Sequence, residues 1–193
     1  MKTKERILNS ALSLFSRNGY DGTSMEQIAD LVGIRAPSLY KHFKGKEDIL
    51  NELISIAESR YEEFFGSDSN IGKIPENHEE MIEAQMKRIR FTMSDPMIRM
   101  TRIFLVKEQF RNKKLAEITS KHQIDGLQKM YTRIIEGMME KGLFRKDDPQ
   151  FLALELISPV SLLISKADRE IEFEKEALEL IEKHIRHFCD VYK

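Results

Sequence analysis

The chain has 193 residues, of which 41% are hydrophobic, and a single cysteine, Cys189. This length and apolar content suffice for one or two folded domains, and the balance of 31 basic against 32 acidic residues excludes a chain kept disordered by self-repulsion. A single cysteine excludes an internal disulfide and a Cys-x-x-Cys zinc site, which favours a reducing, cytoplasmic location.

The sequence predicts helices nearly throughout. Apolar residues recur at helical spacing, as Ile7, Ala11 and Phe15 do in the first segment, and no run alternates in the manner of a strand. Glycines and prolines separate the segments, and residues 66–75 form the clearest loop. The predicted helices span about residues 3–18, 24–32, 37–43, 46–65, 76–93, 96–112, 113–141, 149–166 and 172–191. The fold class is therefore all-α, with about nine helices.

The near-zero net charge hides an asymmetry between the two ends of the chain. Residues 1–46 hold eight basic and four acidic side chains, a net charge of +4, so the remaining residues carry −5. A basic end on an acidic body suggests that the first segment contacts a polyanion.

Residues 23–46 combine three features of a DNA-reading element. Two short helices meet at a tight turn that begins at Gly33, and apolar residues are spaced to close these helices on each other. Ala29 allows a close helix crossing, whereas Leu39 and Phe43, four residues apart, face inward. The opposite face of the second helix is polar and basic. Together these features describe a helix-turn-helix, whose second helix enters the DNA major groove.

These residues resemble the TetR family of transcriptional regulators. The matching stretches read TSMEQIADLVGI over residues 23–34 and PSLYKHFKGKEDIL over residues 37–50, and Phe15 with Gly19 matches the family's first helix. Arg35 departs from the pattern, because a small hydroxyl residue is common there. The resemblance implies an N-terminal helix-turn-helix domain over residues 1–46 and a larger helical ligand-binding and dimerisation domain over residues 47–193.

The candidate DNA contacts fall into three groups according to their chemistry. Donors that can reach base edges are Arg35, Ser38 and Lys41. Apolar contact with thymine methyl groups is expected from Ala36 and Pro37. The residues that look like the family's phosphate contacts are Thr23 or Ser24, Tyr40, His42 and Lys46.

One such element reads few base pairs, so specificity requires two copies of it. The stretch Phe151–Ile164 is apolar almost all round, and with the final helix and their symmetry mates it can form a four-helix dimer bundle, as in the family. The alternative is the central core helix of a monomer. We expect no membrane segment, because this stretch contains Glu155 and Pro159 and is too short to span a bilayer.

Methionines are concentrated in the middle of the chain, where eight of the ten fall between residues 81 and 139. Methionine is flexible and lines cavities of varied shape, and the resemblance implies a small-molecule pocket in this region. The alternative is that these methionines are ordinary core filling. The predicted ligand-binding residues are Met86, Met97, Met100, Phe104, Met130, Tyr131 and Met138.

These observations predict a homodimeric repressor that a small hydrophobic ligand releases from a palindromic double-stranded DNA operator. The alternative is a DNA-binding regulator, either a repressor or an activator, that a protein partner controls. No enzyme motif or clustered acid–base set is present, so we expect neither an enzyme nor a cofactor. His184, His187 and Cys189 lie close together, but they fit solvated histidines beside a buried cysteine better than a metal site.

Overall fold

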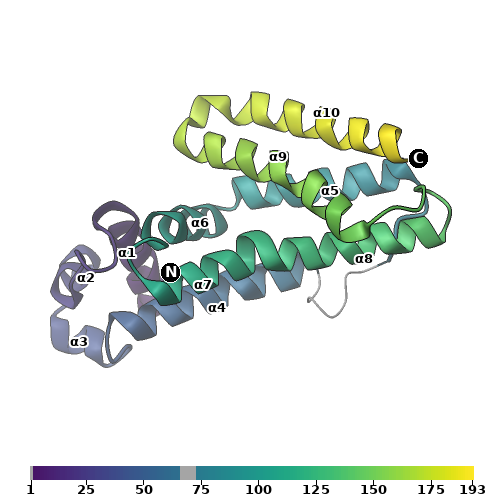
Figure 1. Ribbon diagram of the computed structural model, residues 1–193. Coiled ribbons are helices and arrows are strands. Elements are labelled where there is room, and N and C mark those ends of the chain that lie inside the picture. The colour runs from purple at the N-terminus through teal and green to yellow at the C-terminus, as the bar shows by residue number, and fades with distance from the viewer. Residues whose placement is uncertain (1, 66–72) are drawn as a thin grey trace. The chain divides into compact units, whose positions relative to one another are not determined.

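The computed structural model describes residues 2–65 and 73–193, and helices dominate both ranges (Figure 1). The predicted loop at 66–75 lies outside the described residues except for 73–75, which are not helical. The α-helices are α1 (Thr3–Asn18), α2 (Met25–Val32), α3 (Ala36–Tyr40), α4 (Lys46–Phe65), α5 (His78–Ser94), α6 (Pro96–Glu108), α7 (Lys113–Ser120), α8 (Gly126–Glu140), α9 (Pro149–Arg169) and α10 (Glu174–Tyr192).

The predicted helix over 113–141 is present but contains an irregular turn. A π-helical turn, Lys121–Asp125, joins α7 to α8, and Ser120 and Gly126 on either side have right-handed helical backbone angles. Counted as one continuous helix, these segments bring the described residues to nine helices, as the sequence predicts. A 3-10 turn, Ile171–Phe173, precedes α10.

The helices α2, α5 and α9 begin where a capping side chain satisfies their first backbone N–H groups. The Ser24 hydroxyl accepts a hydrogen bond from the Gln27 amide at 3.2 Å, and the Gln27 side chain accepts one from the Ser24 amide at 2.8 Å, which completes a capping box. The Asn77 side chain caps α5 by accepting a hydrogen bond from the Glu80 amide, and Asp148 caps α9 ahead of Pro149. The predicted start of α9 is therefore confirmed.

Several predicted helix ends differ from the structure by a few residues, and for two of them the hydrogen bonds give the reason. The third helix ends at Tyr40 instead of Phe43, because the amides of His42 and Phe43 both turn back to the Leu39 carbonyl. The sixth ends at Glu108 instead of residue 112, because the Asn112 side chain caps the next helix through the Leu115 amide at 3.2 Å. Local hydrogen bonds of this kind shift helix ends by a few residues without changing the fold.

The described helices form two compact units. The first comprises residues 1–61 and 96–119, and the second comprises residues 62–95 and 120–193. The sequence placed one boundary at residue 46. In the structure α6 packs on α1 although the two are far apart in the chain, so the reading element gains α6 and α7 from beyond that boundary.

The core of the first unit closes the helix-turn-helix around α1. Ile7, Phe15, Ile28 and Leu39 are fully buried, and Phe104 of α6 joins them with its ring centroid 5.5 Å from that of Phe15. Burial of such side chains contributes about 1.5–3 kcal/mol each. The short helices α2 and α3 are held by this shared core, since helices of their length are not stable alone.

The second unit packs α9 against α8 and α10 and packs α10 against α5. Only one side of α9 is covered, by Leu152, Leu156 and their buried neighbours. The helix is longer than the sequence predicted, and by length and composition alone it is apolar enough to cross a membrane, although 28% of its most apolar window is buried. A single helix of this kind is weak support for a membrane span, because core helices of soluble proteins pass the same test.

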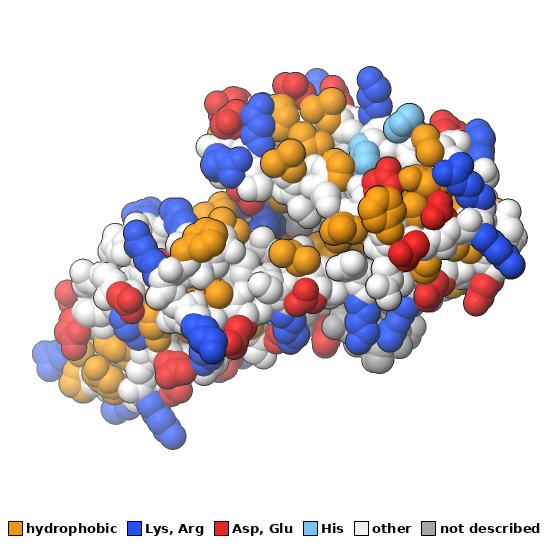
Figure 2. All heavy atoms as spheres, in the orientation of Figure 1, with side chains coloured by type: hydrophobic (Ala, Val, Ile, Leu, Met, Phe, Trp, Pro, Cys, Tyr) orange, Lys and Arg blue, Asp and Glu red, His pale blue; other side chains and the backbone are white. Residues whose placement is uncertain are grey.

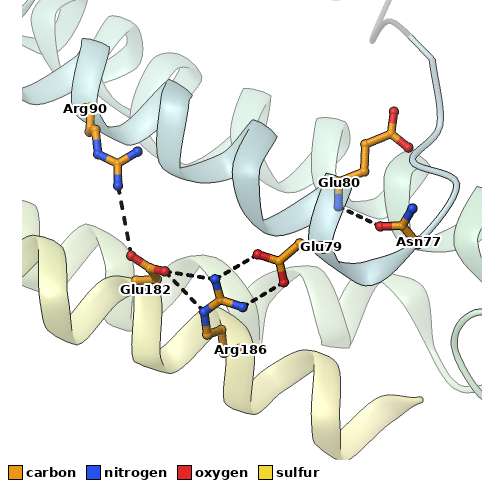
Figure 3. A network of polar contacts seen from close by, with 6 residues as sticks. All are labelled: Asn77, Glu79, Glu80, Arg90, Glu182 and Arg186. Carbon is orange, nitrogen blue, oxygen red and sulfur yellow. Dashed lines mark hydrogen bonds and ion pairs between the residues drawn. The ribbon is translucent and has the colours of Figure 1, made fainter.

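An ion network on the surface of the second unit joins α5 to α10 (Figure 3). Arg186 of α10 donates two hydrogen bonds to Glu79 of α5, at 2.8 and 2.9 Å, and others to Glu182, which also lies 4.0 Å from Arg90. These hydrogen bonds from Arg186 hold the pKa of the Glu79 carboxyl below its usual range. The bidentate geometry links these two helices at the surface.

Candidate DNA-binding surface

The turn between α2 and α3 depends on a left-handed backbone at Gly33. Gly33 has φ 76° and ψ 37°, which a side chain would disfavour. The amide of Gly33 donates to Asp30 at 3.0 Å and that of Ile34 donates to Ala29 at 3.0 Å, so the turn closes the end of α2. Ala29 is 1% exposed, consistent with the predicted close helix crossing.

The outer face of α3 is open to solvent, as the sequence predicted. Leu39 is 0% and Phe43 5% exposed, whereas Tyr40 is 48% exposed and Lys41 is also exposed. Ala36 is half-buried. We define the reading surface as Arg35, Ala36, Pro37, Ser38, Tyr40 and Lys41.

Arg35 begins α3 without a side-chain cap. Its backbone carbonyl accepts hydrogen bonds from the amides of Ser38 and Leu39, at 2.8 and 3.3 Å, but its guanidinium makes no capping bond. The departure from the usual small hydroxyl residue therefore costs α3 a cap. It also leaves the exposed Arg35 guanidinium on the reading surface, where it can reach an acceptor outside the chain.

Thr23 and Ser24, which the sequence treated as alternatives, have different surroundings. Thr23 is 1% exposed, and its hydroxyl donates to the Gly19 carbonyl at 2.8 Å. Ser24 is half-buried, and its hydroxyl caps α2. Of these two residues, Ser24 has the side chain closer to solvent.

Lys46, at the start of α4, points into the protein. Its ammonium group donates to the carbonyls of Tyr20 at 2.7 Å and Thr23 at 3.1 Å, and the Asp21 carbonyl lies 3.5 Å away. The same ammonium lies 4.5 Å from the centre of the Tyr20 ring, a cation–π distance. The α1–α2 corner, residues 16–24, is thus tied to α4.

The end of α6 contacts the same corner. Lys107 donates to the Ser16 carbonyl at 2.7 Å. The adjacent Glu108 is 3% exposed, and its carboxylate lies so close to Gly19 that an added methyl group would come within 2.8 Å of Oε1. Gly19 also has φ 79°, so both its backbone and its surroundings require a residue without a side chain.

Basic residues at the start of α1 contact the end of α2 and the residues that follow α3. Arg6 donates to the Val32 carbonyl at the end of α2, and Lys4 pairs with Glu52 at 2.6 Å and lies 5.6 Å from the centre of the Phe43 ring. An open hollow of about 390 Å³ adjoins this pair. It is lined by Lys4, His42, Phe43, Asp48, Asn51, Glu52 and Ser55, none of which belongs to the predicted ligand-binding set.

The structure divides the predicted ligand-binding residues between the two units. Met97, Met100 and Phe104 pack in the core of the first unit. The others pack in the core of the second unit, where the hydroxyl of buried Tyr131 donates to Gln85 and the guanidinium of Arg88 contacts the sulfur of Met130. The members in the second unit are Met86, Met130, Tyr131 and Met138.

The C-terminal histidines and cysteine show no arrangement for metal binding. Burial raises the pKa of the Cys189 thiol to about 11, which keeps it protonated and unreactive at neutral pH. His184 Nε2 lies 3.0 Å from the Leu156 carbonyl. Among the described residues, no group of three or more His, Cys, Asp or Glu side chains is placed to hold a metal ion.

The contacts of Lys107 and Glu108 with the α1–α2 corner have no signal in the sequence, and the sequence also does not show that the Lys46 ammonium donates to backbone carbonyls. Lys107 and Ser16 are 91 positions apart, so no local pattern shows that they meet. For Lys46 the sequence does contain a signal. Residues 19–23 form a turn, so their backbone carbonyls lack helical partners and are natural acceptors for a nearby ammonium.

Comparison with known proteins identifies this surface. Residues 7–53 match the family described as bacterial regulatory proteins, tetR family. The negative transcriptional regulator IcaR of the biofilm operon icaADBC is 43% identical over 51 residues in Staphylococcus aureus (strain Newman) and 41% identical over 51 residues in Staphylococcus epidermidis. The first of these matches covers 26% of this chain and 27% of the relative, so the chain matches only about a quarter of the length of these curated relatives.

Solved structures extend the similarity of the fold to the whole chain. SmeT, the repressor of the Stenotrophomonas maltophilia multidrug efflux pump SmeDEF, has a TM-score of 0.72 at 18% identity and covers 100% of this chain and 91% of its own. SmeT in complex with triclosan gives a TM-score of 0.77 at 18% identity, with coverage of 98% and 91%. A chain from Mesorhizobium loti assigned to the TetR family gives 0.69 at 22% identity, with coverage of 98% and 96%.

The segment and fold comparisons agree with each other and with the geometry of the helix-turn-helix. The matched segment, residues 7–53, contains α1, α2, α3 and the start of α4, and it includes every residue of the reading surface. The match assigns residues 7–53 to the DNA-binding segment of a family of transcription regulators, as the resemblance in the sequence implies. Residues 7–53 thus match the DNA-binding segment of the TetR family, and the described chain has the fold of solved TetR-family structures.

Proposed function

We propose that the chain is a homodimeric repressor that binds a palindromic DNA operator and is released from it by a small hydrophobic ligand. The observation that carries the proposal is the reading surface on α3, which is polar and basic on its exposed side and supported by buried Leu39 and Phe43. An arginine that reaches guanine from such a helix contributes about 1–3 kcal/mol of base discrimination. The function of IcaR as a negative regulator supports repression.

The roles of individual residues follow from their exposure. Arg35, Ser38 and Lys41 have donors that can reach base edges, and Ala36 and Pro37 fit thymine methyl groups. Tyr40 and His42, both exposed, together with Ser24, are proposed phosphate contacts. The buried hydroxyl of Thr23 supports only an indirect role, through its backbone at the start of α2.

Selection of DNA from a random duplex pool tests operator binding. We expect the enriched sequence to be palindromic, with half-sites about 34–36 Å apart or a multiple of that spacing. Arg35→Ala and Lys41→Ala are expected to change the preferred bases. Lys113→Ala removes an exposed charge from α7 in the same unit and serves as the control. A pool that shows no enrichment with the wild-type chain would contradict the proposal.

Dimerisation is proposed through α9 and α10, which carry large exposed apolar side chains, and Figure 2 shows hydrophobic side chains at the surface of this part of the molecule. A contiguous exposed apolar surface is typical of a protein–protein interface, and we propose that these side chains form one. This apolar face consists of Phe151, Leu154, Leu162, Leu180 and Val191. An isologous pairing of the face gives a two-fold dimer and therefore two reading surfaces.

Ligand binding is proposed in the methionine-rich core of the second unit. That core holds the hydrogen-bonded pair of buried Gln85 and Tyr131, and the side-chain nitrogen of Gln123 in the π-turn is buried without a hydrogen-bond partner among the described residues. An unsatisfied buried amide costs about 1–3 kcal/mol, so an acceptor on a ligand would bind there favourably. The complex of SmeT with triclosan shows that a relative of this fold accepts a hydrophobic phenol.

A thermal-unfolding screen tests this part of the proposal. Triclosan, hydrophobic cations and fatty acyl compounds are added in turn, and a compound that binds the folded chain raises its melting temperature by mass action. The same compound must weaken operator binding, because a ligand with equal affinity for both conformations shifts no equilibrium. A compound that binds without weakening operator binding would favour control by a protein partner.

We propose a cytoplasmic location, where such a regulator meets DNA.

A further inference from the structure

We propose that the π-helical turn Lys121–Asp125 is a two-state element through which a bound ligand acts on operator affinity, and that the Gln123 amide detects a hydrogen-bond acceptor on that ligand. The proposal rests on the ligand binding proposed above, and it adds the chemical class of the ligand and the segment that responds to it. The turn follows residue 119 almost directly, where the chain passes from the first unit to the second.

One backbone hydrogen bond defines the turn. The Gly126 amide donates to the Lys121 carbonyl, five residues earlier, whereas an α-helix uses the carbonyl four residues earlier. The π turn therefore contains one residue more than an α-helical turn. Single turns of this kind inside α-helices are rare and are frequent at functional sites.

The extra residue matters because the apolar stripes of α7 and α8 are out of phase along the chain. In the first unit α7 buries Leu115 and Thr119. Arg133 follows Leu115 by about five turns of an uninterrupted α-helix and would continue that stripe, but Arg133 is exposed. The next residue, Ile134, is buried in the core of the second unit instead. The additional residue of the π turn supplies this later phase.

Gly126 is the residue that permits the π form. A methyl group added at Gly126 would come within 2.9 Å of the Lys121 carbonyl oxygen, which is too close for a backbone atom. In an uninterrupted α-helix the same amide would bond to the His122 carbonyl, and alanine is the residue that this helix favours most. By helix propensity alone, Gly126→Ala shifts the equilibrium toward the α form about fivefold.

Little packing of the turn itself opposes a change between the two forms. None of residues 121–125 is buried, no side chain caps the turn, and Ser120 and Gly126 on either side have right-handed helical backbone angles. Conversion to the α form exchanges one backbone hydrogen bond for another and changes the helix phase by about 100°. The change is passed to α7, which packs in the core of the first unit through Leu115.

The side chain of Gln123 makes the preference of the turn depend on a ligand. Its amide nitrogen is buried and has no hydrogen-bond partner among the residues that the structure describes. A donor buried in this way is unfavourable unless an acceptor reaches it. A hydrophobic compound with a carboxylate or carbonyl oxygen removes this cost in the π form. The α form turns Gln123 elsewhere, so such a compound selects the π form, whereas a hydrophobic cation does not.

The sign of the coupling follows from the release proposed above. A ligand that releases the operator must favour the form that binds the operator less well. The π form is therefore the released form, and the α form is the operator-binding form. A variant that favours one form imitates the presence or the absence of the ligand.

Two substitutions bias the turn in opposite directions. Gly126→Ala disfavours the π form, whereas Gln123→Met removes the unpartnered amide at similar volume and favours it. Ser120→Ala, at an exposed site beside the turn, raises helix propensity without approaching the Lys121 carbonyl and is the matched control. Amide hydrogen exchange of the DNA-free chains reports the backbone, and fluorescence anisotropy on the duplex enriched from the random pool reports operator affinity.

We expect Gly126→Ala to slow exchange at residues 121–127 and to tighten operator binding about two- to fivefold. Gln123→Met is expected to weaken operator binding by a similar factor, and Ser120→Ala to change neither exchange nor affinity. Exchange that is unchanged or faster in Gly126→Ala would overturn the second form of the turn. Operator affinities of Gly126→Ala and Gln123→Met that stay unchanged or move in the same direction would overturn the coupling.

Decanoate and decyltrimethylammonium test the acceptor, because their alkyl chains are similar in length and only the carboxylate accepts hydrogen bonds. Decanoate is expected to raise the melting temperature of the wild-type chain more than that of Gln123→Met. An equal rise in both would overturn the role of Gln123. A wild-type chain that binds neither compound, or no duplex, would overturn the proposed function, and exchange in Gly126→Ala would still decide whether the turn has a second form.

Discussion

The two compact units have similar apolar cores but surfaces of different chemical character. In the first unit the exposed side of α3 is polar and basic, and lysine ammonium groups bind backbone carbonyls at the α1–α2 corner. In the second unit α9 and α10 expose large apolar side chains, and the charged groups form an ion network at α5 and α10 (Figure 3).

This difference shows that the two units depend on different kinds of interaction for their proposed tasks. A reading element must hold a five-residue helix in one orientation, so its neighbours bind even the backbone of the preceding turn. An apolar face needs only shape and area, so most of its members are ordinary side chains at helical spacing. The first unit is therefore expected to be sensitive to single polar contacts, and the second to changes in apolar surface.

Truncating a core residue behind the reading surface is expected to have the largest effect. Leu39→Ala removes a side chain that is 0% exposed and is expected to cost about 2–5 kcal/mol of unfolding free energy, together with operator binding. Ile135→Ala, at a residue equally buried in the second unit, is expected to cost a similar amount but to preserve binding while the chain is folded. Urea unfolding and anisotropy measure both. Loss of binding by both variants below their unfolding midpoints would contradict the division into two units.

A charge placed on the apolar face is expected to break the dimer without unfolding the chain. Leu162 is 67% exposed, so Leu162→Asp is expected to leave the melting temperature of the monomer unchanged but to weaken dimerisation by about 2 kcal/mol or more if this residue lies in the centre of the interface. Sedimentation velocity measures the dimer. Lys175→Asp, at an exposed site on α10 outside the face, is the control. An unchanged dimer in Leu162→Asp would place the interface elsewhere.

Loss of the cap of α2 is expected to have an intermediate effect. Ser24→Ala removes the acceptor of the Gln27 amide, which costs about 1 kcal/mol of unfolding free energy. Ser38→Ala, on the reading surface, is expected to change stability by less than about 0.5 kcal/mol while altering operator binding. Chemical denaturation of both variants gives the comparison. Equal stabilities would show that the capping box does not support α2.

The ion network of the second unit is expected to have the smallest effect and to depend on pH. Because the pKa of Glu79 is lowered in the folded chain, the network stabilises the fold above the ordinary carboxyl pKa of about 4.3. This stabilisation is lost as the pH falls through the lower folded value. Arg186→Met is therefore expected to be slightly less stable than the wild-type chain at pH 7, and equally stable at pH 2 to 3. A difference that persists at low pH would point to lost packing of the arginine stem.

The sequence alone determined the helical architecture, the position of the helix-turn-helix and the exposed side of α3. These features depend on local spacing: Leu39 and Phe43 four residues apart, a glycine at 33, and a serine and an aspartate at helix starts. Helix ends such as those of α3 and α6 were less accurate, because a single backbone or side-chain hydrogen bond decides them.

Only the tertiary structure decided that α6 and α7 belong to the reading unit, that Lys46 points inward, and that the predicted ligand-binding residues fall into two cores. Each of these depends on contacts between segments distant in the chain, such as that of Lys107 with the Ser16 carbonyl. A local pattern records which face of a helix is apolar but contains no information about which distant backbone group will approach its ends. In this chain, contacts between distant segments decide which backbone carbonyls Lys46 and Lys107 bind.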